Sequence, residues 1–430
     1  MKCPSRSLVV FSMLFALQFG GMLVIASNGM ATEYSKASVL FLLISPSARI
    51  NGMGEAGVAV PDEPMGYYNP ATPALYTRGY NITYVADTGR TGWLPALASD
   101  IYYSFSGIQI GADLTALRPF FRGREEGMAS EPAGLFHRLK RNVSVGVALS
   151  RYKTEFDMGT QIRTNEYGVE IGSFRSMDKA TNTVISANAH FLADFSAGMT
   201  LIDYESDLGP FGAGMEKDRV KAKGSARNYG LMIRLPLVRA LETLSGHSVK
   251  LPNRLRPVLE STYGVSWNNR GDDVCYIEAR QADPLPRNRK SGYSLKLGLC
   301  MDYRGTSLDL FRVLIAAEKE RTQIPSSKRS DVTDKIGFEQ EVLETLVFRW
   351  GKYDDTPGHV RMSTEGVTIK SDGLMKILGS LYSDGNIADP GILTYVASHL
   401  SIAWHKSTYE ADHTPLDGSE FEQFTLSLSF

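Results

Sequence analysis

Cysteine and histidine, the residues that most often bind metals or act as nucleophiles and bases, are few and scattered in this chain. The three cysteines, Cys3, Cys275 and Cys300, form no Cys-x-x-Cys pair, and the 7 histidines form no HExxH or HxxxH motif. His399 and His405 can share one face of a strand, but six residues of extended chain separate them by roughly 20 Å. We therefore expect no metal, no cofactor and no catalytic centre, and a protein that is not an enzyme.

Two short motifs have a simpler interpretation than their letters suggest. Residues 52–57 (GMGEAG) match the GxGxxG pattern of dinucleotide-binding folds, in which the glycines connect a strand to a helix. Because Pro61 and Pro64 would break such a helix, these glycines are predicted to form turns. Arg270–Asp272 spells RGD, an integrin-binding tripeptide, but the alternation around it predicts a hairpin turn at residues 270–271.

The composition excludes one class of partner and favours one fold class. Lys and Arg number 46 against 47 Asp and Glu, a net charge of -1 that offers no basic surface, so we expect no nucleic-acid partner. With 40 Gly, 20 Tyr and 19 Phe, the chain has the residues of many turns and aromatic-rich strands. An all-β fold is expected.

The amino terminus has the pattern of an export signal. Lys2 and Arg6 precede an apolar run over residues 8–26, and small residues follow as far as Ala31. Residues 1–31 are predicted to be a cleaved signal peptide, with an uncleaved membrane anchor as the alternative. Beyond it the longest apolar run is VLFLLI at 39–44, too short for a spanning helix, so the mature protein is either soluble outside the cytoplasm or a closed barrel.

Strand after strand in residues 141–430 shows two-residue alternation. In residues 293–303 (YSLKLGLCMDY) one face is continuously apolar and the other is polar or small, and residues 259–268 and 143–150 divide in the same way. A soluble β-sandwich would also alternate. The run from Ile392 to Trp404 exceeds the usual length of soluble strands, however, and favours the wall of a membrane barrel.

The candidate strands amount to an even number, as expected of a bacterial barrel. They lie near 80–87, 100–112, 142–152, 162–174, 183–193, 196–206, 226–235, 257–268, 272–282, 292–303, 307–318, 337–343, 346–353, 360–370, 392–407 and 421–430. Residues 372–381 can be either a short helix or a hairpin. We predict a transmembrane antiparallel β-barrel of 14 to 16 strands.

The two cysteines of the barrel region are a candidate disulfide. A two-residue turn at 270–271 would place Cys275 on the polar face of the next strand, and alternation places Cys300 on the polar face of its own. If the hairpin loop is centred near Arg287-Asn288, the two residues lie opposite each other and could form a bridge in an oxidising compartment. Two free thiols in the lumen are the alternative.

Residues 44–71 (ISPSARINGMGEAGVAVPDEPMGYYNPA) resemble the amino-terminal segment of the FadL-like outer-membrane proteins, which include the long-chain fatty-acid transporters and the PorV group. The carboxyl end, FTLSLSF, is similar to the terminal strand that the barrel-assembly machinery recognises through a final Phe, here Phe430. The pattern is most similar to that of uncharacterised spirochaetal members. The resemblance implies a hatch at residues 32–78 that plugs the lumen and an outer-membrane barrel at 79–430.

The resemblance also implies a function, which is the passage of hydrophobic small molecules such as long-chain fatty acids. The candidate residues for ligand binding or for the hatch are Arg49, Gly52, Met53, Gly54, Asn69 and Pro70. Arg49 could bind a carboxylate or simply pair with an acidic residue of the wall. The expected partners are the hydrophobic molecule, outer-membrane lipid and the assembly machinery.

The alternatives are a PorV-like barrel that docks a protein partner and a soluble periplasmic β-protein. An apolar pocket under the hatch would favour transport, whereas a polar interior would favour docking.

Overall fold

The computed structural model describes residues 37–77, 79–114, 143–210, 219–249, 251–277, 282–303, 306–324, 332–356, 358–382, 399–412 and 415–430. The predicted signal peptide, residues 1–31, lies outside this part of the chain, as do the first residues of the predicted hatch. Among the described residues, no helix has both the length and the apolar character needed to cross a membrane.

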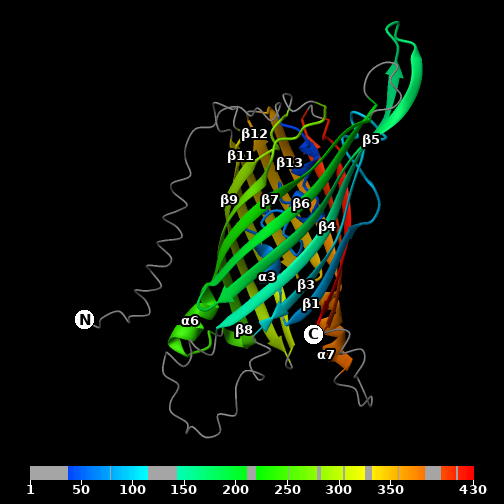
Figure 1. Cartoon of the computed structure of the whole chain (residues 1–430). Helices are drawn as coiled ribbons and strands as arrows, with labels where there is room; N and C mark the ends of the chain where they lie inside the picture. Colours follow the sequence, from blue (N-terminus) through cyan, green and yellow to red (C-terminus); the bar gives the residue numbers. More distant parts are fainter. Residues whose placement is uncertain are drawn as a thin grey trace.

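Within the described residues, fourteen antiparallel strands form a closed barrel (Figure 1). Neighbours in the sequence are neighbours in the wall, and β1 closes the ring because it pairs with both β3 and β15. The short β2 (Thr91–Gly92) pairs with the start of β3. The wall strands are β1 (Tyr80–Asp87), β3 (Tyr102–Asp113), β4 (Ser144–Thr164), β5 (Glu170–His190), β6 (Asp194–Pro210), β7 (Arg219–Pro236), β8 (Leu255–Gly271), β9 (Asn288–Tyr303), β10 (Thr306–Thr322), β11 (Val332–Val342), β12 (Leu346–Asp355), β13 (Val360–Lys370), β14 (Leu400–Ala411) and β15 (Glu420–Ser429).

The helices are short and lie inside the barrel or at its ends. They are η3 (Leu40–Leu43), α2 (Ala48–Asn51), α3 (Thr72–Tyr76), α6 (Leu237–Ser245), η5 (Pro252–Arg254) and α7 (Asp372–Tyr382). Figure 1 places α6, α7 and the C-terminus at one end, which we call the lower rim. The β4–β5 hairpin projects from the opposite end, the upper rim (Figure 1).

The strands present an apolar face outward and a polar face inward. In β9 the expected division is confirmed, since Leu297 and Leu299 are exposed on the outside while Ser294, Lys296 and Cys300 are buried inside. Exposed apolar side chains recur on the outer face of most wall strands, among them Ile110, Leu149, Ile185, Leu231, Ile315, Trp350 and Ile369. Such an outward apolar band is what a barrel surrounded by lipid requires.

Residues 37–77, which we call the luminal segment, run through the inside of the barrel (blue in Figure 1). Ala48, Ile50, Met53, Val58 and Tyr68 of this segment are almost fully buried. The segment ends in α3, whose first-turn Pro73 fits a helix N-terminus because proline needs no hydrogen-bond partner there. From α3 the chain passes directly into β1.

Fourteen wall strands confirm the predicted range of 14 to 16, and the sixteen candidate segments exceed this number for two reasons. The segments predicted at 142–206 are parts of only three long strands, β4, β5 and β6, and residues 165–169 form the tip of a hairpin. The described part of the segment predicted at 272–282, residues 272–277 and 282, forms no wall strand, because β8 includes the predicted turn and Arg270 pairs with Arg227 of β7. The alternative of a helix for residues 372–381 is confirmed by α7.

The predicted disulfide between Cys275 and Cys300 is corrected by this register. Cys300 lies near the lower end of β9, opposite Arg256 of β8 and Asp309 of β10. Cys275 lies in the loop that follows the upper end of β8. The two thiols are free, with Cys275 exposed and Cys300 buried, because they stand at opposite ends of the wall.

A charge placed in the outward apolar band should destabilise the barrel. Leu231 is 51% exposed on β7 between Tyr229 and Ile233, which face outward as well. Arginine on a lipid-facing position near the bilayer centre costs about 2–4 kcal/mol. We expect Leu231→Arg to lower the free energy of unfolding by that amount in denaturant titrations in lipid vesicles, while Leu231→Val changes it little. Equal stability of the two variants would show that this face does not contact lipid.

Candidate functional site: the lumen and its N-terminal segment

The glycines predicted to form turns in the luminal segment are sites of close contact with the wall. Gly54 has a φ of +61°, and its backbone N–H donates a 2.8 Å hydrogen bond to Thr364 of β13. A Cβ on the facing Gly351 of β12 would lie 2.0 Å from the Gly54 nitrogen. Glycine on both sides therefore lets the segment approach the strands directly. Gly52 and Met53 lie in the same contact, against Gly366 and Gly337.

Asn69 and Pro70 make a second close contact on the other side of the lumen. The Asn69 amide donates to the carbonyl oxygens of Val58, at 2.9 Å, and of Leu231, at 3.1 Å. A Cβ on Gly230 would lie 2.1 Å from Asn69 Oδ1, and one on Gly198 would lie 1.9 Å from the Pro70 oxygen. The predicted hatch residues are thus docking points between segment and wall.

Arg49 is bound by an acidic residue of the wall and not left free for a ligand. Its Nε and Nη2 atoms donate to the two carboxylate oxygens of Glu339, at 2.9 and 2.8 Å. Arg349 of β12 donates to the same carboxylate at 2.7 Å and to Thr368 at 2.6 Å. Of the two roles considered for Arg49, the pairing with a wall acid is the one observed.

A second charged cluster binds the middle of the luminal segment. Lys335 of β11 lies 3.1 Å from Glu55 of the segment and 2.9 Å from Glu320 of β10. Tyr409 donates a 2.8 Å hydrogen bond to Glu55. The backbone N–H of Val58 donates to Glu318 at 2.8 Å. Because these groups are buried and mutually paired, they hold the segment in one position.

Below the luminal segment lies a cavity of about 1160 Å³ that reaches toward the lower rim. The segment contributes Ser47, Arg49, Asp62 and Glu63 to its lining. The lining contains eleven Asp or Glu residues against eight Lys or Arg residues. The cavity is therefore charged, with acidic residues in excess, and it is not an apolar pocket.

Asp62 and Glu63 are adjacent acidic residues with opposite electrostatic environments. Burial opposes ionisation of Asp62, but Lys296, 2.5 Å away, and Arg49 outweigh it and hold its pKa below the ordinary value. At Glu63 burial dominates the attraction of Arg49 and raises the pKa above the ordinary value.

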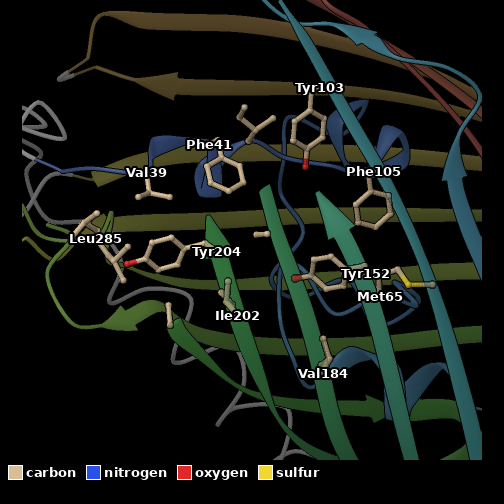
Figure 2. Close-up of a cluster of buried hydrophobic side chains, with 14 of the residues drawn as sticks. Val39, Phe41, Met65, Tyr103, Phe105, Tyr152, Val184, Ile202, Tyr204 and Leu285 are labelled. Atoms are coloured by element: carbon tan, nitrogen blue, oxygen red, sulfur yellow. The ribbon is translucent and has the colours of Figure 1, made fainter. Parts of the chain in front are cut away.

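The upper part of the lumen is apolar and aromatic. Figure 2 shows Phe41 of η3 projecting between Tyr103 of β3 and Tyr204 of β6. Tyr152 of β4 packs against Phe105, with ring centroids 5.5 Å apart. The first part of the luminal segment thus packs into a filled apolar region, and an open charged cavity lies below the segment.

Several groups that bind the luminal segment were not predicted from the sequence. Glu339, Arg349 and Lys335 are charged residues on inward-facing positions of β11 and β12. In the sequence, each of them is a charged residue on the polar face of an alternating strand. That pattern predicts a position in the lumen but does not identify the partner. Among the described residues, no group of three or more His, Cys, Asp or Glu side chains could hold a metal ion.

Comparisons with known proteins show a likeness of fold only. No family model and no curated protein matches this chain. The Ralstonia pickettii toluene transporter TbuX is 11% identical over 90% of this chain and 98% of that one, with a TM-score of 0.40. A Pseudomonas aeruginosa FadL homologue is 11% identical over 93% and 99%, with a TM-score of 0.33. The β-domain of the Bordetella autotransporter BrkA is 11% identical over 82% and 99%, with a TM-score of 0.34. Membership of the FadL-like family, and of its spirochaetal branch, stays a prediction.

Proposed function

We propose that this chain is an outer-membrane channel for hydrophobic small molecules, with residues 37–77 acting as a hatch. The observation that carries the proposal is the division of the lumen by one segment that belongs to no wall strand. Aromatic side chains of the wall pack against the upper part of the segment, and below it a cavity leads to the lower rim. A wall of fourteen strands encloses more space than its own side chains fill, so movement of the segment can open a path.

A narrower proposal is that the channel passes long-chain fatty acids, but the residues that line the lumen give this proposal little support. A carboxylate buried without a partner is costly, so its site needs an available cation. Arg49 is already bound by Glu339, and acidic residues exceed basic ones around the lower cavity. The class of hydrophobic molecules is therefore better supported than the fatty acids.

Uptake by intact bacterial cells tests the channel. Cells that lack their own channels for hydrophobic compounds would express this chain and receive radiolabelled dodecane. We expect faster accumulation than in cells with an empty vector, with no change in the uptake of a small polar solute that reports general leakage. Equal accumulation in both kinds of cell, with the barrel folded in the outer membrane, would refute the channel function.

Docking of a protein partner is a second candidate, favoured by the charged interior below the luminal segment and by the β4–β5 hairpin. Pairing with β3 ends at Asp157 and pairing with β6 begins at Met177, so residues 158–176 form a two-stranded ribbon beyond the wall (Figure 1). Ile162, Tyr167 and Val169 on this ribbon are 63, 81 and 59% exposed. Exposed apolar side chains on a projecting hairpin are typical of a protein-binding surface.

Photo-crosslinking in intact cells separates the two candidates. A photoreactive residue at Tyr167 should give one defined protein adduct if the hairpin docks a partner. The same residue at Tyr80, in the outward band near the lower rim, is the control and should not give that adduct. A chain that takes up dodecane and gives no adduct from Tyr167 is a channel without a docking role.

A further inference from the structure

A small void in the upper lumen contains polar atoms without partners. Its volume is about 20 Å³, room for one water molecule at most. Among the described residues the hydroxyl of Tyr103 and the Oδ1 atom of Asn268 have no hydrogen-bond partner, and both residues line this void and are more than nine-tenths buried. Buried polar atoms are usually paired, so two unpaired atoms on residues that line one void indicate a site for a ligand with hydrogen-bonding groups.

The wall around this void has an amide side. Asn182 of β5, Asn228 of β7 and Asn268 of β8 all line it. Asn268 donates a 2.7 Å hydrogen bond to Asn288 of β9, which in turn donates to Glu320 at 2.6 Å. These bonds engage the nitrogen of the Asn268 amide and leave its oxygen, on a residue that lines the void, without a partner.

The other lining residues of the void include apolar side chains, several of them from the luminal segment. Phe41, Leu42 and Leu43 of η3 line the void together with Tyr152 and Ile202. Leucine side chains thus line the same void as the asparagines, and they cannot donate a hydrogen bond to the unpaired Asn268 oxygen. They stand where the chain of an amphiphile would lie.

We infer that the upper lumen holds a binding site for an uncharged amphiphile, covered here by η3, with Tyr103 and Asn268 binding its polar head. The inference rests on the proposed channel function and narrows its substrate class. An apolar chain would take the place of Phe41, Leu42 and Leu43. A hydroxyl or amide head would reach the two orphan groups.

The charges next to the void exclude an anionic head. Lys290, which lines the void, lies 3.6 Å from Glu320, and Lys335 is shared by Glu55, Glu318 and Glu320. Three carboxylates therefore surround two ammonium groups. A further carboxylate would meet repulsion without an available cation, whereas a hydroxyl meets none.

The covering helix η3 is held in a way that permits displacement. Its N-cap residue Val39 has a φ of +61°, a strained conformation for a β-branched side chain, and no side chain caps the helix. Tyr67 donates hydrogen bonds to the carbonyl oxygens of Leu42 and Ile44, at 3.0 and 2.7 Å. The charged clusters that bind Arg49 and Glu55 lie further along the segment, so η3 can leave while they stay in place.

Binding of three twelve-carbon probes to the full-length barrel in lipid nanodiscs tests the site. The probes are 1-dodecanol, dodecanoate and dodecane, and protein-free nanodiscs correct for partition into lipid. We expect dodecanol to bind at least tenfold more tightly than dodecanoate. Tyr103→Phe and Asn268→Leu should each weaken dodecanol about fivefold, the value of one hydrogen bond, and leave dodecane unchanged. Asn188→Leu, which removes an orphan amide oxygen in the lower cavity, is the matched control and should have no effect.

Truncation of the covering helix η3 gives a second test, in which the affinity for dodecanol should rise instead of fall. Phe41→Ala removes the main anchor of η3, so displacement costs less and the apparent affinity for dodecanol should rise at least tenfold. Phe421→Ala truncates another buried aromatic residue away from the void and should leave the affinity unchanged.

The outcomes separate the inference from the channel function. Unchanged dodecanol binding in Tyr103→Phe, Asn268→Leu and Phe41→Ala would show that the void holds only a water molecule and would overturn the inference. If cells still take up dodecane in that case, the channel function stands alone. If no cell takes up dodecane, the channel function fails, and the three variants then report only on the binding site.

Discussion

Glu339→Gln should detach the luminal segment and destabilise the barrel by about 3–5 kcal/mol, the usual cost of breaking a buried ion pair by removal of one partner. The Glu339 carboxylate accepts hydrogen bonds from both Arg49 and Arg349, and Arg349 is only 1% exposed. Without the negative charge, two guanidinium groups would face each other in the lumen. Denaturant unfolding in lipid vesicles measures the loss, and protease sensitivity of residues 37–77 reports the detachment.

Glu420→Gln is the matched control for this substitution. Glu420 pairs with Lys406 at 2.9 Å, but its side chain is 54% exposed, and exposed pairs contribute about 0–1 kcal/mol. Arg49→Gln is the complementary variant, because it frees the segment while Glu339 keeps its bond to Arg349. We expect it to increase protease sensitivity with a smaller loss of stability. If Glu339→Gln behaved like Glu420→Gln, the cluster would not be what holds the segment.

The barrel wall could be predicted from the sequence because its signal is local. Residues 80–87 and 360–370 were predicted with the bounds that β1 and β13 have. In β9 alternation alone separated the outward leucines from the inward Lys296 and Cys300. Lipid outside and a polar lumen inside act on every second residue, so each strand carries its own pattern whatever its partners are.

One error arose where a turn had to be distinguished from the continuation of a strand. Arg270-Gly271 has the residues of a turn, yet β8 continues through it and Asn269 takes a φ of +56° within the strand. The Asn269 backbone N–H donates a hydrogen bond to the side chain of Asn228, at a bulge in β8. A bulge can absorb turn-like residues without reversing the chain, and nothing in the local sequence distinguishes the two. The wrong disulfide followed from this one error.

The contacts of the luminal segment lie beyond what one sequence can give. Arg49 and Glu339 are 290 positions apart, and several other inward acidic residues were equally suitable partners. The same holds for the glycine pairs. Gly54 indicates that the backbone approaches another element closely, but it does not identify Gly351 as the residue opposite. The sequence therefore indicates candidate residues of the segment without identifying their partners in the wall.

Deletion of residues 37–77 should convert the closed barrel into an open pore. All fourteen wall strands lie outside the deletion, and the backbone pairing that closes the ring between β1 and β15 involves no residue of the segment. The wall charges that bind the segment, such as Lys335 and Glu339, would become hydrated, which removes the cost of leaving them buried and unpaired. In planar lipid bilayers we expect the single-channel conductance to rise at least tenfold over that of the intact chain.

The β4–β5 hairpin supplies the control for the deletion. Replacing residues 162–173 by a two-residue Asn-Gly turn, flanked by the paired Gln161 and Phe174, shortens the projecting ribbon and leaves the lumen as it is. This variant should conduct no better than the intact chain. A correctly assembled deletion of residues 37–77, judged by a shift in electrophoretic mobility on heating, that still failed to conduct would show that other residues close the lumen. The segment would then be a ligand-binding or structural insert, and groups outside residues 37–77 would close the lumen.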